Sequence, residues 1–310
     1  MVDAYIAVGY HCNENCHFCP CNKSDTIKSF IPINDLICTV DNMAKQRVDT
    51  LIISGGEPTV YPYLPLLLQY VQKCCISAII LSNSERFSES EFINTLVQTI
   101  DLEKISVITT LHSHLEIEHE QANGTIGSFD KTLAGLKNLI EKKTSVIIKH
   151  CITKQNLKYL FEFYKFIDRQ FPESINMQLC SIDYCGVEEL VTKDDAVIFP
   201  DIRKSLEEML DYHITRLSEG SKRKLVCYNL PLCSCDPYYW RFFAAKSERG
   251  YSAYFDPDLY DKSTVLFNVD NDVDTDPLAC KDCKALHLCP GTYKTAFKLF
   301  GKALVKPFIV

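Results

Sequence analysis

Short apolar runs alternate with longer amphipathic stretches along the first two thirds of the chain. Runs such as "TLIIS" (50–54) are almost continuously apolar, which is typical of strands covered on both faces. Each run is followed by apolar residues at helical spacing, as in "SFDKTLAGLKNLIEKK" (128–143). The pattern predicts strands at 4–10, 50–54, 77–83, 104–112, 145–152 and 174–182, and helices at 34–46, 63–74, 88–100, 128–143, 156–170 and about 200–218.

These six strand–helix units predict an α/β fold with a parallel sheet. Six units are too few to close an eight-stranded barrel, so we expect an open, partial (β/α)6 barrel of the TIM type. In such sheets the chemistry lies at the carboxyl ends of the strands. Before the helix at 88–100, Ser88 and Glu91 have the spacing of a capping box.

The regular alternation stops near residue 225, where cysteine, proline, aspartate and aromatic residues increase. The stretch "FNVDNDVDTDP" (267–277) is acidic and irregular. We therefore expect two regions, a barrel over 1–222 and a small, metal-organised, cysteine-rich region over 223–310.

Charge and hydropathy exclude some classes of function. The formal net charge is −7, so no strong positive field favours a nucleic-acid partner. The short basic run "KRK" (222–224) is expected to be a solvated stretch between elements. No run of about 18 apolar residues predicts a membrane span. No secretory segment is expected, because Asp3 lies where its apolar core would begin. We expect a cytoplasmic protein.

Sixteen cysteines are many for a protein of a reducing compartment, where clustered cysteines indicate metal binding or catalysis. Four lie within residues 12–21 and six within 227–289. Core packing is the default expectation for the remaining ones, which are Cys38, Cys74, Cys75, Cys151, Cys180 and Cys185.

The segment "YHCNENCHFC" (10–19) follows the first expected strand and contains Cys12, Cys16 and Cys19. Three thiolates leave one iron of a four-iron cluster with an open position, which is what distinguishes a reactive site from a closed structural one. The alternative is a zinc site, with Cys21, His11 or His17 as the fourth ligand.

The second strand ends in "ISGGEPT" (53–59). Gly55 and Gly56 allow backbone to come close to a ligand, and Pro58 fixes the turn. The Glu57 carboxylate, together with backbone carbonyls, is suited to grip an ammonium group. The alternative is an ordinary strand-to-helix turn.

The combination of CxxxCxxC after strand one and GGEP after strand two resembles radical S-adenosylmethionine (SAM) enzymes. The resemblance implies that Cys12, Cys16 and Cys19 hold a [4Fe–4S] cluster whose open iron binds SAM. It implies that the reduced cluster cleaves SAM to a 5′-deoxyadenosyl radical, with an electron donor such as flavodoxin or ferredoxin. Further cofactor-binding positions implied by the match are Phe18, Gly55, Gly56, Glu57, Pro58, Ser82 and Asn83.

The C-terminal motif CxxCx5CxG resembles the auxiliary-cluster regions, SPASM and twitch, of radical SAM peptide maturases, most of all those of the His-Xaa-Ser type. Tyr293 stands where the full SPASM pattern has another cysteine, so one auxiliary [4Fe–4S] cluster is expected rather than two. A four-cysteine zinc site is the alternative. The preferred ligands are Cys233, Cys280, Cys283 and Cys289, with Cys227 and Cys235 in reserve.

Several residues at strand ends are candidates for the barrel mouth. We expect His112 near SAM or substrate, and His114 and His119 on a surface loop. One of Lys149 and His150 should face the cavity, because alternate strand residues point to opposite faces; Lys149 is the candidate cofactor contact. Asp183 and Cys185 are candidate proton or hydrogen donors, with packing as the default.

The leading functional hypothesis is a radical SAM enzyme that modifies a ribosomally made peptide by a crosslink, a thioether or epimerisation. Leader recognition is then expected from a separate partner or from the barrel itself. The runner-up is a radical SAM enzyme acting on a small molecule or cofactor precursor. The third hypothesis is a zinc-stabilised binding protein without catalysis.

Overall fold

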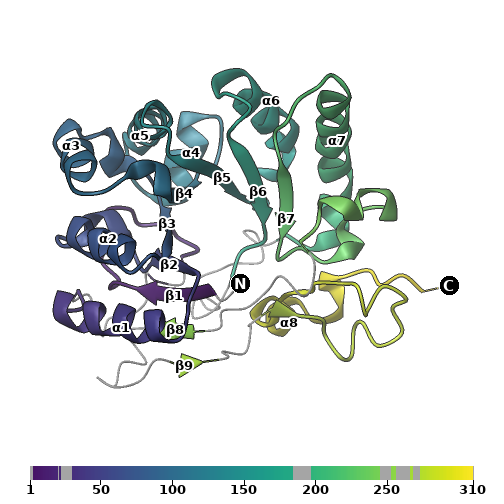
Figure 1. The fold of residues 1–310 in the computed structure, drawn as a ribbon. Coiled ribbons are helices and arrows are strands. Elements are labelled where there is room, and N and C mark those ends of the chain that lie inside the picture. The colour runs from purple at the N-terminus through teal and green to yellow at the C-terminus, as the bar shows by residue number, and fades with distance from the viewer. Residues whose placement is uncertain are drawn as a thin grey trace.

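The computed structural model describes residues 3–19, 21, 30–183, 197–244, 253–255, 266–267 and 273–309. The expected α/β partial barrel is confirmed. Seven parallel strands form a curved sheet in the order β7-β6-β5-β4-β3-β2-β1, with helices α1 to α7 on its outer side (Figure 1). The strands are β1 (Asp3–Ala7), β2 (Thr50–Ser54), β3 (Ser77–Ser82), β4 (Ile105–Thr110), β5 (Ser145–Cys151), β6 (Asn176–Cys180) and β7 (Leu225–Tyr228).

The helices between these strands match the expected ones closely, with one addition. Pro65 and Pro200 lie in the first turns of α2 and α7, where a missing N–H costs no hydrogen bond. The addition is α4, which lies within a stretch expected to be a loop. The helices are α1 (Ile33–Lys45), α2 (Leu64–Lys73), α3 (Ser90–Thr99), α4 (Glu116–Asn123), α5 (Ser128–Glu141), α6 (Leu160–Gln170), α7 (Phe199–Ser218) and α8 (Lys294–Phe300).

The sheet continues beyond the six expected strands at both edges. β7 pairs with β6, and β8 (Ala253–Phe255) pairs in parallel with β1. β9 (Leu266–Phe267) runs antiparallel to β8, and β10 (Val273–Asp274) pairs with β11 (Thr292–Tyr293) in a separate two-stranded sheet. Strands from the last third of the chain therefore complete both sides of the barrel sheet.

The core lies between the sheet and the helices. In β5, Val146, Ile148 and His150 are buried against the helical layer, whereas the alternate residues point to the inner side of the barrel. His150 stacks on Phe163 of α6 with a ring-centroid distance of 4.1 Å. The side chains that can contact a ligand are therefore those on the inner face of the sheet, because those on the outer face pack against the helices.

Two local expectations were wrong. Ser88 does not cap α3; its hydroxyl donates to the carbonyl of Glu85 at 2.6 Å within a short 3-10 turn, and α3 begins after Glu89. The run 222–224 is not fully solvated either. The Arg223 side chain is buried and donates to the carbonyls of Ile175 and Phe171, which satisfies backbone acceptors between α6 and β6.

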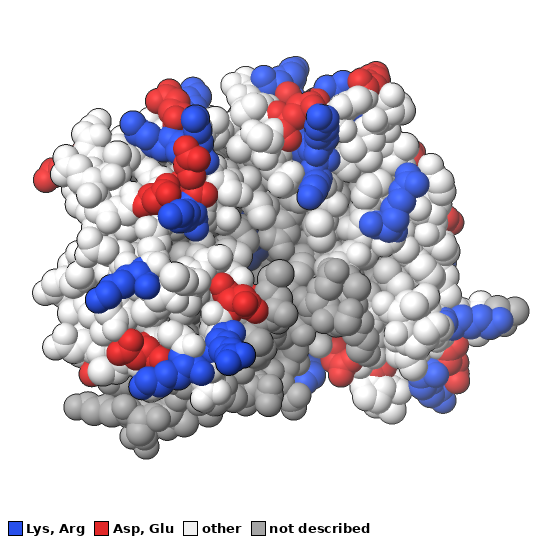
Figure 2. Space-filling view, viewed as in Figure 1, with Lys and Arg blue, Asp and Glu red and all other residues white. Residues whose placement is uncertain are grey.

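Basic and acidic side chains are mixed over the visible face of the molecule, mainly on the outer helices (Figure 2). Among the residues that the structure describes, no helix combines the length and apolar character needed to cross a bilayer.

Candidate functional site

The loop that follows β1 brings Cys12, Cys16 and Cys19 together. Cys12 is exposed and the other two are half-buried. The Cys19 N–H donates to the Cys16 carbonyl at 3.1 Å, which closes the second half of the loop. Although Cys12 is exposed, the protein around its thiol removes part of its solvation, which raises its pKa to about 12. The nearby negative charges of Glu57, Glu14 and Cys19 add to the effect. Three such thiols would repel one another as thiolates unless a positively charged group lay among them, so this donor set fits a metal cluster.

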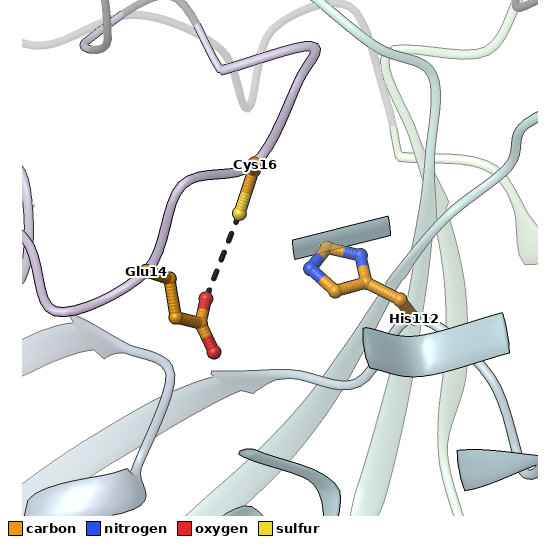
Figure 3. Close-up of side chains that lie close together, drawn as sticks. All are labelled: Glu14, Cys16 and His112. Carbon is orange, nitrogen blue, oxygen red and sulfur yellow. Dashed lines mark hydrogen bonds between the residues drawn. The ribbon is translucent and has the colours of Figure 1, made fainter. Parts of the chain in front are cut away.

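Helix α4 holds the cysteine loop in place. The Asn15 N–H donates to the Asn123 carbonyl at 2.8 Å, and the Asn123 amide donates to Glu14 at 2.8 Å. The other carboxylate oxygen of Glu14 accepts from the Cys16 thiol at 3.6 Å (Figure 3). The sequence had not identified Glu14 and Asn123 as site residues, because only the fold brings α4 to this loop.

His112 lies on the opposite side of Cys16 from Glu14 (Figure 3). Ligand atoms of Glu14, Cys16 and His112 all lie within 4.8 Å of one another. The His112 ring is fully surrounded by protein, which lowers its pKa well below the ordinary value and keeps it neutral. Among the residues that the structure describes, its buried Nδ1 has no hydrogen-bond partner, and the Phe18 ring meets the His112 ring edge-on at a centroid distance of 5.4 Å. An orphaned buried nitrogen beside the cysteine loop is an observation that fits a bound cofactor.

The expectation for the neighbouring histidines was wrong. His119 is in α4 and is buried; its Nδ1 accepts from the His112 backbone N–H at 3.2 Å. His114 is half-buried against the rings of Tyr159 and Phe166. His119 thus contacts the backbone of His112, His114 packs against two aromatic rings, and neither residue lies on a surface loop.

The two glycines of the GGEP motif pack against the cysteine loop. A Cβ atom on Gly55 would lie 2.2 Å from the Gly9 carbonyl oxygen, and one on Gly56 would lie 2.2 Å from that of His11. The Gly56 N–H donates to Gly9 at 2.9 Å, and the Glu57 N–H donates to His11 at 2.8 Å. Only glycine permits this approach, so the motif fixes the loop that carries the thiols.

The Glu57 carboxylate does not face an open ligand site as the sequence had led us to expect. It is buried and accepts hydrogen bonds from the Thr59 N–H and hydroxyl, the Ser82 hydroxyl and the Asn83 N–H, at 2.6 to 3.0 Å. Its oxygens therefore brace the carboxyl ends of β2 and β3. The Gly55 carbonyl of the same turn accepts from the Cys21 thiol at 3.3 Å.

Ser82 and Asn83 lie where β3 ends. The Ser82 hydroxyl is used within the protein, donating to Glu57 and accepting from the Ser84 N–H. The Asn83 amide donates to Asn13 at 2.9 Å. Asn83 thus ties β3 to the cysteine loop, and both residues lie directly beside the candidate cofactor site.

On β5, the alternation assigns Lys149 to the inner side, because His150 is packed against α6. The Asp183 carboxylate, after β6, accepts from the Thr295 hydroxyl at 3.3 Å. Cys185 lies outside the described residues, so its candidate role stays a prediction.

Four cysteines of the C-terminal region line one cavity. Cys233, Cys280, Cys283 and Cys289 surround it together with apolar residues that include Leu286, Phe297 and Phe308. The Leu232 and Gly291 N–H groups each donate to the Cys289 sulfur at 3.4 Å, a contact that tunes cluster thiolates in iron–sulfur proteins. Cys227 and Cys235 do not line this cavity and are fully buried in the main core.

A family-level comparison bears on this geometry. Residues 6–167 match the model of the radical SAM superfamily, which covers more than half of the chain. The chain belongs to the radical SAM superfamily. This fold implies a [4Fe–4S] cluster and SAM as cofactors, and the three thiols of the β1 loop fit such a cluster.

Curated relatives of this radical SAM protein have different names. An Fe-coproporphyrin III synthase of Methanosarcina barkeri is 22% identical over 165 residues, covering 51% of this chain and 39% of the synthase. A probable GTP 3′,8-cyclase of Sulfolobus acidocaldarius is 21% identical over 253 residues, covering 80% of this chain and 77% of the cyclase. The match thus spans well under half of the synthase.

Among solved structures, Streptococcus suis SuiB bound to S-adenosylmethionine has the same fold, with a TM-score of 0.68 and 15% identity. The alignment covers 99% of this radical SAM protein and 76% of SuiB. SuiB bound to its precursor peptide SuiA aligns with a TM-score of 0.58 and 19% identity, over 70% of this chain and 47% of that one.

Proposed function

We propose that this radical SAM protein uses Cys12, Cys16 and Cys19 to hold a [4Fe–4S] cluster and modifies a ribosomally made peptide by hydrogen abstraction. The observation that carries the proposal is the position of the three thiols, on a loop held by both glycines of the GGEP motif and by Asn83. When bound, the cluster and SAM supply a 5′-deoxyadenosyl radical that abstracts a hydrogen atom from the substrate.

The chain's own residues bind and shield the cofactor. The carbonyls of the Gly55–Gly56 turn would accept from the amino group of SAM, because the Glu57 carboxylate is occupied and the Cys21 thiol that meets the Gly55 carbonyl is only a weak donor. Phe18 and the neutral His112 ring form an apolar wall beside the thiols, and this wall excludes water. Lys149 supplies a positive charge on the inner side of the barrel, where a carboxylate would bind.

We further propose one auxiliary [4Fe–4S] cluster, held by Cys233, Cys280, Cys283 and Cys289, in a region that begins near residue 223. The support is a cavity lined by all four thiols and the two N–H donors directed at Cys289. Four thiolates complete a four-iron cluster and leave no iron open, so this cluster would serve electron transfer or substrate positioning rather than SAM cleavage.

A peptide substrate is the leading proposal because SuiB, a solved structure whose alignment covers 99% of this chain, is also seen bound to a precursor peptide. The expected product is a crosslink, a thioether or an epimerised residue. Leader recognition would come from a separate partner or from the barrel itself, and a flavodoxin or ferredoxin would supply the electron. The second candidate is a small molecule or cofactor precursor, because the curated relatives are named as a coproporphyrin synthase and a GTP cyclase.

The first test is to purify the protein without oxygen, count iron and sulfide, and repeat the count with Cys12, Cys16 and Cys19 all changed to Ala. We expect about eight irons falling to about four in the variant. Incubation with SAM and a reductant should give 5′-deoxyadenosine only with the unmutated protein. A count of about four falling to none would remove the auxiliary cluster and favour small-molecule chemistry. Zinc in place of iron would overturn the radical mechanism.

A further inference from the structure

Two cysteines outside both cluster motifs face each other at the end of the barrel strands. Cys151 is the last residue of β5, Cys180 is the last residue of β6, and the two are register partners in the parallel pair. Their sulfur atoms lie 3.4 Å apart, within hydrogen-bonding distance for thiols. Core packing was the default expectation for both residues, but packing alone does not require two thiols in contact.

Lys149 links this pair electrostatically to residues of the candidate SAM site. Lys149 lies two residues before Cys151 and so on the same, inner face of β5. Its positive charge acts on both cysteines, on the neutral His112 ring beside Phe18, and on Tyr293 of β11. The pair therefore lies on the inner face of the sheet, where the charge of Lys149 acts on it.

The contact between the two sulfurs favours a thiolate on Cys151 and a thiol on Cys180. The hydrogen bond from Cys180, together with the positive charge of Lys149, lowers the pKa of Cys151, although burial opposes this effect. The same contact raises the pKa of Cys180. Either sulfur can be the donor, so the proton can lie on Cys151, which is half-buried, or on Cys180, which is buried.

We propose that Cys151 and Cys180 form a thiol pair that donates a hydrogen atom to carbon-centred radicals formed in the barrel, with Cys151 as the donor. This inference rests on the proposed function. The proton that rests on Cys180 first transfers to Cys151 through the contact between the two sulfurs. The S–H bond of Cys151 then breaks homolytically, the hydrogen atom forms a C–H bond on the radical carbon, and a thiyl radical remains. The Cys180 thiolate shares its electrons with that radical in a three-electron S–S bond. One electron from the low-potential one-electron donor that also reduces the cluster, with one proton, restores the thiol and thiolate.

This assignment gives the barrel a means of returning hydrogen to a substrate radical. A peptide carbon that loses hydrogen on one face and receives it from Cys151 on the other is inverted. The chemistry that the pair favours within the proposed function is therefore epimerisation, or another reaction in which the product keeps its hydrogen count.

The test uses the cluster-loaded protein with SAM and dithionite in D2O, without a substrate. Thiol protons exchange with solvent, and the first carbon radical in the barrel is then the 5′-deoxyadenosyl group. We expect solvent deuterium in the 5′-deoxyadenosine, measured by mass spectrometry per molecule formed. Cys151→Ser should lose this label, because an alcohol O–H does not give up a hydrogen atom as a thiol does, and Cys38→Ser on α1 should keep it. An equal label in all three proteins, or none in the unmutated protein, would overturn the inference.

A second readout does not depend on turnover. Iodoacetamide at pH 7, added to the cluster-loaded protein without SAM, should label Cys151 more slowly in Cys180→Ala, because the hydrogen bond that maintains the thiolate is lost. Cys38→Ala should leave the rate unchanged. A rate that rises or stays constant in Cys180→Ala would show packing alone and contradict the inference. Absence of 5′-deoxyadenosine from the unmutated protein would instead contradict the proposed function, and the labelling would still decide whether the pair is reactive.

Discussion

The backbone N–H of Asn83 donates a 2.7 Å hydrogen bond to the carboxylate of Glu57. The contact joins the end of β3 to the end of β2, and Glu57 accepts three further hydrogen bonds from Thr59 and Ser82. Burial raises the pKa of Glu57, and these donors partly offset that effect. The acidic residue of the GGEP motif therefore connects the ends of two strands through hydrogen bonds.

This arrangement predicts that Glu57→Gln destabilises the fold itself. In this variant one carboxylate oxygen is replaced by an NH2 group, which donates and does not accept. The group that now donates to that oxygen would lose its acceptor, and an unpaired buried donor costs about 1–3 kcal/mol. We expect a lower midpoint of thermal unfolding, measured by circular dichroism. The exposed Glu89→Gln on the neighbouring turn is the control and should change the midpoint little. An unchanged midpoint in Glu57→Gln, with weaker SAM binding, would restore a direct ligand role.

The contact between the two loops predicts a sharp difference between two glycines. Both Gly55 and Gly220 have positive φ, +129° and +99°. A Cβ atom on Gly55 would lie 2.2 Å from the Gly9 carbonyl oxygen, whereas one on Gly220 would meet no described atom within 4 Å. Gly55→Ala should therefore displace the cysteine loop and lose about four irons per chain. Gly220→Ala should cost backbone strain of about 1–2 kcal/mol and keep the iron. Equal iron in both variants would show that the loop does not depend on this approach.

The C-terminal cavity distinguishes between two cysteines that are two residues apart. Cys233 lines the cavity, whereas Cys235 is packed in the main core beside Glu207 and Arg203. Cys233→Ala should lose about four irons, and Cys235→Ala should keep them while unfolding at a lower temperature. Iron and sulfide counts with electron paramagnetic resonance decide between them. The opposite result would assign Cys235 as the ligand.

His213 predicts a specific sensitivity to acid. It is buried in α7, its Nδ1 is hydrogen-bonded to the Tyr164 hydroxyl at 2.7 Å, and burial lowers its pKa to about 4 from an ordinary 6.5. Between these values the unfolded chain binds a proton that the folded chain does not, so stability falls as the pH falls from 6.5 to 4. The slope is at most about 1.4 kcal/mol per pH unit for one histidine. His213→Asn keeps an acceptor for Tyr164, and its unfolding midpoint should decline less steeply from pH 7 to pH 5. Parallel declines would remove His213 as the cause.

The sequence predicted the six central strands and their helices because burial on both faces makes each strand a continuous apolar run. It missed α4 for the opposite reason, since the buried residues of that helix are His119 and Asn123 and leave no apolar stripe to detect. The motif residues were located correctly on the carboxyl ends of β1, β2 and β3. Glu57 was assigned a different contact because its partners Ser82 and Asn83 belong to another strand.

The contact between Cys151 and Cys180 could not be predicted from the sequence either. It depends on the register of β5 against β6, and a shift of one residue would turn one of the thiols to the outer face of the sheet. Register is a property of the assembled sheet, so the pair becomes visible only in three dimensions.

The last third of the chain supplies the neighbours of both outer strands of the six-strand sheet, β7 beside β6 and β8 beside β1. A chain cut at residue 222 would expose two rows of unpaired backbone groups, which is the usual starting point for edge-to-edge aggregation. The barrel and the cysteine-rich region therefore cannot be exchanged as independent modules. A graft that gave this barrel a different C-terminal region would need to bring two strands with it, one for each side.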